Sequence, residues 1–154
     1  MSGRFNFYQL APEAMKLMIA FEKYIHSTDL DPKIIELIKV RSSQINHCAH
    51  CLNMHTKDAM HIGETAQRLF LVAAWREAEL FTDAERAALA LTEAVTLISN
   101  GSVPNDVYNE VKKHFSEKQI VDLIIAINQI NCWNRLNVTA QSPVGDYEPG
   151  KYSH

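Results

Sequence analysis

Cysteine and histidine residues between positions 48 and 55 have the types and the spacing that thiol chemistry requires. Cys48 and Cys51 are three positions apart, and His55 follows four positions later, so a helix would place all three side chains on one face. The dipole and the free N–H groups at a helix N-terminus stabilise a thiolate, the nucleophilic form of cysteine. A cationic His55 stabilises it further, whereas a neutral one accepts the thiol proton. Two close thiols also form a reversible disulfide, which predicts a two-electron redox centre.

The same spacing permits two other interpretations. Cys48, Cys51 and His55 could be three ligands of a zinc ion, although such sites usually take a second ligand pair from farther along the chain. The fourth ligand would then be one of four nearby side chains: His47, His50, His61 or Glu36. Alternatively, both cysteines could be buried and inert, because free cysteine often behaves as a small hydrophobic residue. We expect His47 and His61 to be ordinary surface residues.

The elements that position these residues are predicted to be helices. Glycine and proline number only five each in 154 residues, about half of average usage, which is too few for the turns of an all-β fold. Apolar residues at helical spacing follow Pro12 to about His26, and Asp31-Pro32 starts a second helix. Segment 48–62 forms a third, which ends at Gly63. The chemistry therefore lies where the second and third helices meet.

Glu36 lies in the second of these helices among apolar neighbours. A glutamate on a helix is usually solvated or ion-paired, but these neighbours favour partial burial. A buried carboxylate with a raised pKa could exchange protons with a thiol near neutral pH. Glu36 is therefore a candidate for proton transfer.

The rest of the chain continues the helical pattern. Four further helices are expected: 65–75, one that begins at a Thr82–Glu85 capping box and ends near Asn100, 104–115, and one from a Ser116–Gln119 capping box to about Val138. The prediction is an all-α bundle of about seven helices in one domain, residues 1–154, with a core of about 15–138. We expect the tail, residues 139–154, to run over the surface or across a neighbouring subunit. The last helix is apolar nearly all round, which predicts burial on all sides and a homo-oligomer.

Net charge and hydropathy limit the classes of binding partner and the cell compartment that we expect. The net charge is -3, which argues against nucleic acid or an anionic membrane as the main partner. The longest apolar run, Leu69 to Trp75, is far shorter than the roughly 18 residues of a membrane span. The N-terminus lacks the pattern of a signal peptide. We therefore expect a cytoplasmic protein, in whose reducing surroundings a close cysteine pair is catalytic or metal-binding.

A longer motif surrounds the cysteines and resembles a known family. The run from Glu36 to Asn46, followed by Cys48-Ala49-His50-Cys51 and then His55, resembles the alkylhydroperoxidase D core of the carboxymuconolactone decarboxylase superfamily. That pattern is a glutamate, a cysteine twelve residues on, a second cysteine after x-x, and a histidine after x-x-x. The resemblance continues at Trp75-Arg76 and at Asn131–Arg135 and covers roughly residues 15–138.

The resemblance implies an alkylhydroperoxidase D-like fold and an antioxidant thiol peroxidase that reduces hydroperoxides. Spacing leaves open which thiol attacks, since the helix N-terminus favours Cys48 and the base one turn later favours Cys51. The resemblance implies that Cys51 attacks, that Cys48 resolves the sulfenic acid into a disulfide, and that Glu36 and His55 form a proton relay with help from His50. It also implies an external dithiol as reductant, such as a lipoyl group on a partner protein, with no tightly bound cofactor, and trimers or hexamers.

Two features of the chain bear on the alternatives. The best-described alkylhydroperoxidase D proteins have a longer N-terminal region that repeats the helical fold, and this chain has room for one copy. The lactone decarboxylase branch lacks the paired cysteines, so the presence of both Cys48 and Cys51 argues against that activity. Two alternatives stay open: a zinc-binding or redox-sensing module without turnover, and a carboxymuconolactone decarboxylase-like enzyme.

Overall fold

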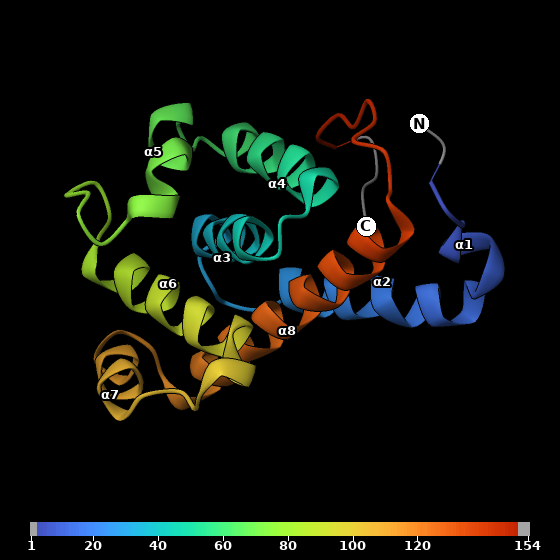
Figure 1. Ribbon diagram of the computed structural model, residues 1–154. Coiled ribbons are helices and arrows are strands. Elements are labelled where there is room, and N and C mark those ends of the chain that lie inside the picture. The colour runs from blue at the N-terminus through green and yellow to red at the C-terminus, as the bar shows by residue number, and fades with distance from the viewer. Residues whose placement is uncertain (1–2, 151–154) are drawn as a thin grey trace.

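All regular secondary structure in residues 3–150, the part of the chain described by the computed structural model, is helical (Figure 1). The α-helices are α1 (Phe7–Leu10), α2 (Pro12–His26), α3 (Pro32–Ile45), α4 (Ala49–His61), α5 (Ala66–Leu71), α6 (Asp83–Thr96), α7 (Asn105–His114) and α8 (Glu117–Ala140). Two short 3₁₀ helices, Val72–Ala74 and Ile98–Asn100, follow α5 and α6. The predicted all-α class is confirmed.

Local signals in the sequence set most helix boundaries. The Asp31 side chain accepts a hydrogen bond from the N–H of Lys33 at the start of α3, as an N-cap residue does. Both predicted capping boxes form, at the starts of α6 and α8. Gly63 follows α4 with φ 89°, a conformation that favours glycine.

Three elements differ from the expected ones. The four-residue α1 was not predicted, and the Asn6 side chain caps it by accepting from two backbone N–H groups. The expected helix 65–75 and the expected helix to Asn100 each end earlier and continue as a 3₁₀ turn, which is common at helix ends. In the single chain α8 is not buried on all sides, because Val121 is 51% exposed, and the expected burial through a homo-oligomer stays a prediction.

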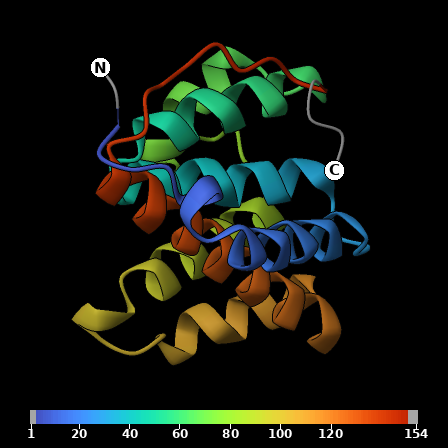
Figure 2. The same cartoon turned by 90° about the vertical axis from the view of Figure 1, so that its right-hand side faces the viewer.

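Helix α3 lies at the centre of the bundle and positions the candidate site. It packs against α4, α6 and α8 (Figures 1 and 2). Every residue from Ile34 to Val40 is buried, including Glu36 and Lys39. A helix surrounded in this way buries its polar side chains along with its apolar ones, so those polar groups need partners inside the protein.

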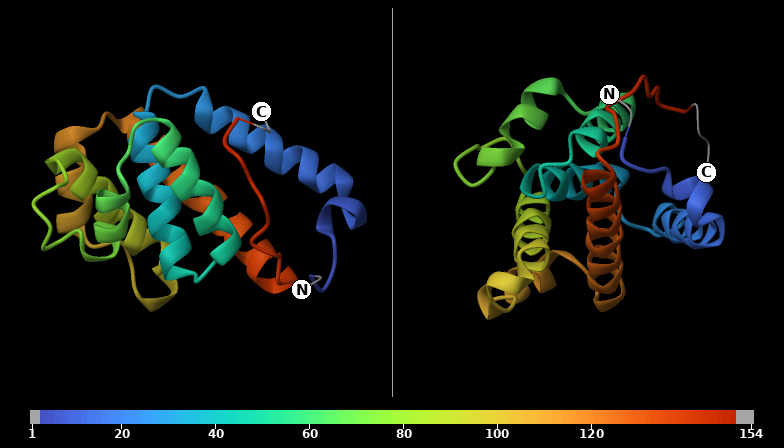
Figure 3. Two further views of the ribbon diagram at one scale, coloured as in Figure 1. Left: turned by 90° about the horizontal axis from the view of Figure 1, so that it is seen from above. Right: turned by 45° about the vertical axis from the view of Figure 1, so that its right-hand side comes forward.

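The chain after α8 turns back along α4. Gln141 adopts a left-handed conformation with φ 52° and ends the helix. The following segment, residues 142–150, runs along α4 of its own chain (Figure 3). Within residues 3–150, no helix combines the length and the apolar character that crossing a membrane requires.

Candidate functional site

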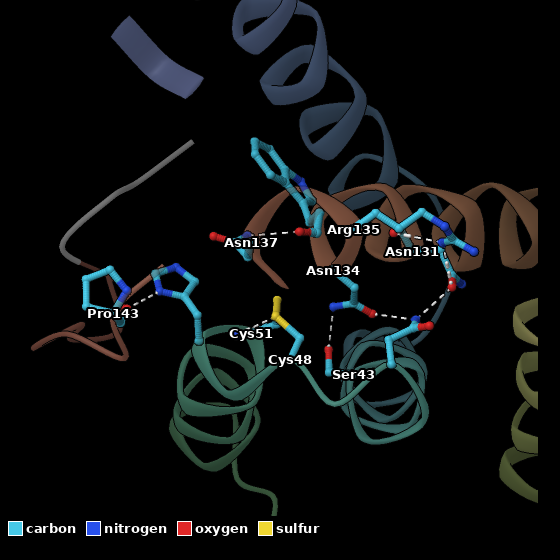
Figure 4. The surroundings of a disulfide bond; sticks show 11 residues. Ser43, Cys48, Cys51, Asn131, Asn134, Arg135, Asn137 and Pro143 are labelled. Carbon is cyan, nitrogen blue, oxygen red and sulfur yellow. Dashed lines mark hydrogen bonds between the residues drawn. A yellow bond between two sulfur atoms is a disulfide. The ribbon is translucent and has the colours of Figure 1, made fainter. Parts of the chain in front are cut away.

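The two motif cysteines form a disulfide at the N-terminus of α4 (Figure 4). Cys48 is the N-cap residue of α4, and its Sγ accepts a hydrogen bond of 3.3 Å from the backbone N–H of Cys51. Their Cα atoms are 5.3 Å apart, and both residues are buried, at 1% and 2% exposure. His47, in the tight turn that joins α3 to α4, has φ 55°. The fold thus places the sulfur pair where helix N–H groups stabilise a thiolate.

A layer of amide side chains fixes this turn against α8. Asn46 Nδ2 donates to Asn131 Oδ1 at 2.8 Å and to Asn134 Oδ1 at 2.9 Å. Asn134 Nδ2 in turn donates to Ser43 Oγ at 3.0 Å, and Arg135 donates to the carbonyl and side-chain oxygens of Asn131 (Figure 4). These bonds satisfy buried polar groups and hold the end of α3, the turn and α8 in one arrangement.

Glu36 and His55, predicted to act together, are in direct contact. His55 Nδ1 lies 3.1 Å from Glu36 Oε2, with Glu36 on α3 and His55 on α4. Glu36 is 5% exposed. His55 is one helical turn after Cys51, so α4 presents both on one face. The structure therefore links the buried carboxylate to the helix face that carries the disulfide.

The expectation that Glu36 has a raised pKa is wrong. Burial by itself raises the pKa of this carboxyl, but the Lys39 ammonium and His55 outweigh burial and lower the pKa below its ordinary value of 4.5. Lys39 Nζ lies 3.3 Å from Glu36 Oε1 and also donates to Glu22 Oε1. Sequence reasoning missed Lys39, although a lysine within the apolar run of α3 was a visible signal. Glu36 is thus held as a carboxylate.

His50 contacts the C-terminal segment. Its Nδ1 lies 2.7 Å from the carbonyl oxygen of Pro143. Next along α4, Asn53 Nδ2 donates to the carbonyl of Val144 at 3.1 Å. Further along α4, two side chains contact Tyr147. Lys57 Nζ donates to the Tyr147 carbonyl, and the Tyr147 hydroxyl donates to the Asp58 carboxylate. His50 therefore lies between the redox pair and the tail and is not hydrogen-bonded to the Glu36–His55 pair.

A cavity of about 330 Å³ opens beside His50. Its walls come from the N-terminal segment, α1, the end of α8 and the tail, and include Phe5, Tyr8, Asn137 and Pro143. Of the motif residues, His50 lines this cavity, whereas Cys48, Cys51 and His55 are not among its lining residues. His47 and His61 are exposed, as predicted.

Metal-ligand atoms of Glu36, His55 and Asp58 lie within 4.8 Å of one another. These groups already have partners in the protein, because Glu36 contacts the Lys39 ammonium and Asp58 accepts from Tyr147. A zinc site built on Cys48 and Cys51 would need the reduced pair, since in the disulfide the two sulfurs are bonded to each other.

These features define an all-helical protein with a buried Cys-x-x-Cys pair next to a Glu–His hydrogen bond. The sequence pattern of the Carboxymuconolactone decarboxylase family matches residues 12–94. The chain therefore belongs to this family, as its motifs predicted.

Known relatives share most of the chain. The uncharacterized protein YdfG of Bacillus subtilis (strain 168) is 46% identical over 138 residues, which cover 90% of this chain and 94% of YdfG. A crystal structure of a protein of unknown function from Agrobacterium tumefaciens, suggested to be the antioxidant defence protein AhpD, matches with a TM-score of 0.91. It is 39% identical, and the match covers 94% of this chain and 99% of that one.

A more distant structure has the same fold. The alkylhydroperoxidase AhpD core of an uncharacterized peroxidase-related protein from Ralstonia eutropha JMP134 is 19% identical, with a TM-score of 0.80. The match covers 90% of this chain and 74% of that one. The predicted alkylhydroperoxidase D-like fold is therefore confirmed.

Proposed function

We propose that the protein is a thiol peroxidase that reduces organic hydroperoxides through the Cys48–Cys51 pair. The observation that carries this proposal is the disulfide at the N-terminus of α4, one helical turn before a histidine that is hydrogen-bonded to a buried carboxylate. A helix N-terminus favours thiolate formation, and the imidazole supplies or removes protons near neutral pH. The suggested antioxidant role of the Agrobacterium relative supports the same function.

The chemistry starts from the reduced pair, with Cys51 as thiolate and His55 as imidazolium. The Cys51 sulfur attacks the terminal peroxide oxygen, an S–O bond forms and the O–O bond breaks. The alkoxide leaves with the proton of His55 as an alcohol, and the sulfur is oxidised to a sulfenic acid. The Cys48 thiol then displaces water from that sulfenic acid and forms the disulfide. An external dithiol, such as a lipoyl group on a partner protein, reduces the disulfide and is itself oxidised.

Ionised Glu36 orients His55 for this role. The Glu36 Oε2 atom accepts from His55 Nδ1, so Nε2 is the ring nitrogen that this bond leaves available for proton transfer. We place the organic part of the hydroperoxide in the cavity that His50 lines. Large apolar side chains that are exposed in the single chain, such as Leu17 and Phe70 at 73% and 76%, support the expected homo-oligomer.

Peroxide turnover with a dithiol tests the proposal. We expect wild-type protein to consume tert-butyl hydroperoxide with dihydrolipoamide as reductant, and Cys51→Ser to lose this activity. Cys132→Ser is the matched control, because Cys132 is free and exposed, and it should keep full activity. In Cys48→Ser, a sulfenic acid trapped by dimedone should be found on Cys51 by mass spectrometry.

Two results would contradict the proposal. Full turnover in Cys51→Ser would show that Cys51 takes no part in the reaction. One equivalent of tightly bound zinc in the reduced protein, without peroxide turnover, would favour the zinc module.

A further inference from the structure

Three charged or titratable groups lie behind the Glu36–His55 pair and have no part in the proposed mechanism: Glu22 and His26 of α2, and Lys39 of α3. Lys39 is 1% exposed, and lysine is almost never buried so completely unless its charge is paired. Its Nζ donates to Glu22 and lies 3.3 Å from Glu36 Oε1 and 3.4 Å from His26 Nε2. Lys39 therefore joins the carboxylate next to the redox pair to a second carboxylate on another helix.

Counted over the residues that the structure describes, the buried charges of this cluster do not balance without a protonated histidine. Glu22 and Glu36 carry two negative charges, and Lys39 carries one positive charge. A buried net charge is expensive, so the cluster favours one further proton. Two imidazoles are placed to carry it: His26 Nε2 lies 3.1 Å from Glu22 Oε1, and His55 Nδ1 lies 3.1 Å from Glu36 Oε2.

Groups from α8, α4 and the tail also face the cluster. Gln129 of α8 donates to the second oxygen of Glu22 and adds no charge. Asp58 Oδ2 of α4 lies 3.7 Å from His55 Nδ1, and the Tyr147 hydroxyl donates to Asp58. The Asp58 side chain is 25% exposed, so solvent screens its charge and we do not count it among the buried charges. It adds to the preference for positive charge at the His55 end.

We propose that Lys39 and Glu22 are positioning residues that hold Glu36 ionised and make His26 and His55 share the one proton that balances the buried charge. The His26 side chain is 45% exposed and that of His55 is 12% exposed, so His26 is the end that exchanges with solvent. When His55 gives its proton to the leaving alkoxide, protonation of His26 restores the charge balance. The role of His26 during turnover rests on the peroxidase function proposed above, whereas the coupling of the two imidazoles does not.

An NMR titration of the histidine ring protons in the disulfide form measures this coupling without turnover. We expect His26→Gln to move the midpoint of the His55 titration to higher pH, because His55 alone then balances the charge. Glu22→Gln should move it to lower pH, because Glu36 and Lys39 then balance with both imidazoles neutral. Each shift should be about half a pH unit or more, as expected for coupled sites.

The matched control is His61→Gln, which removes an exposed histidine at the end of α4 and should leave the His55 midpoint unchanged. Equal midpoints in wild type, His26→Gln and Glu22→Gln would overturn the coupling, even in a protein with normal peroxide turnover. Shifted His55 midpoints in a protein without peroxide turnover would support the coupling and contradict only the proposed peroxidase function. In active protein, the alkaline limb of kcat should move in the same direction as the midpoint in each variant.

Discussion

Two largely buried carboxylates of this protein, Glu93 of α6 and Glu36 of α3, are both held in the ionised state but by different partners. Glu93 accepts from Arg41 Nε at 2.8 Å, from the indole N–H of Trp75 at 2.9 Å, and from Arg76. Burial raises its pKa, but these donors outweigh burial and lower it. The pKa of Glu36 is lowered in the same way by Lys39 and His55.

The difference between the two clusters lies in what their donors can do. Guanidinium and indole groups keep their protons throughout the physiological range, so the Glu93 cluster ties α3, α6 and the segment after α5 together and moves no proton. An imidazole gains and loses its proton near neutral pH, so the cluster around Glu36 can take part in proton transfer. A lowered carboxyl pKa therefore does not by itself identify a functional site, whereas a titratable partner close to a redox pair does.

The largest expected effect comes from Glu36→Gln. The neutral amide no longer stabilises a protonated His55, and loss of assisted proton transfer typically costs 10²-fold or more. We expect kcat for tert-butyl hydroperoxide to fall about 100-fold, equivalent to about 2.7 kcal/mol. Steady-state turnover with dihydrolipoamide measures it.

Glu93→Gln is the matched control for that measurement, because it makes the same chemical change in the other cluster. Its kcat should stay within about twofold of wild type, since it contributes to fold stability only. A 100-fold loss in both variants would mean that Glu36 also acts through the fold, and the distinction between the clusters would fail.

In acid the two clusters should behave alike. The pKa values of Glu22 and Glu93 are lowered by folding, so their stabilisation is present above the ordinary pKa of 4.5 and is lost as pH falls through the folded-state values. Each such group contributes up to about 1.4 kcal/mol per pH unit to the decline. Glu22→Gln and Glu93→Gln should each flatten the fall of the free energy of unfolding between about pH 5 and pH 3, measured by urea denaturation.

Glu110→Gln provides the exposed control for the acid experiment. The pKa of Glu110 is lowered by Lys113 and His114, but solvent screens such surface pairs. Its variant should keep the wild-type slope. A slope that is equally flat in all three variants would show that burial does not distinguish these carboxylates.

At neutral pH the effect of Glu93→Gln on stability should be smaller than the catalytic effect above. The amide keeps one acceptor oxygen but loses the charge that Arg41, Trp75 and Arg76 share. Hydrogen bonds to a charged group contribute about 1.5–3 kcal/mol, so partial loss should lower the free energy of unfolding by about 1–2 kcal/mol. Urea denaturation at pH 7 measures it, and a loss below about 0.3 kcal/mol would contradict a structural role.

Much of this comparison could be predicted from local sequence. Pro32, Gly63 and the two capping boxes act within one helical turn of themselves, so they set helix boundaries without help from the rest of the fold. The Glu36–His55 contact followed from a family motif that spans the two helices. The small α1 was missed because a single asparagine, Asn6, is its main signal.

Lys39, the main charge that lowers the pKa of Glu36, lies three positions on in the same helix, so that pairing could be predicted from the sequence. The burial of Lys39 could not, because it depends on tertiary partners. Lys39 is buried beside Glu22, which α2 supplies, and Gln129 of α8 completes that contact. Neither of these contacts with Glu22 follows a helical spacing. The path of the tail was hidden for a related reason: His50 and Lys57 bind backbone carbonyl groups of Pro143 and Tyr147, and side-chain types do not encode those contacts.

The smallest expected effect comes from the tail. Tyr147→Phe removes the hydroxyl that donates to Asp58, next to His55. A single hydrogen bond contributes about 0.5–1.5 kcal/mol, and the loop of tail that it anchors has further bonds through Asn53 and Lys57. We expect thermal unfolding to shift by a few degrees at most and kcat to stay within about twofold.

Tyr108→Phe on α7 is the matched control, since Tyr108 is exposed and lies outside the site. If Tyr147→Phe instead lowered kcat as strongly as Glu36→Gln, Asp58 and the tail hydroxyl would belong to the proton-handling cluster. The Tyr147 phenol would then take part in proton transfer together with the imidazoles, unlike the guanidinium and indole donors of Glu93. Unchanged kcat with a small loss of stability would instead group the tail contact with the fixed donors of Glu93.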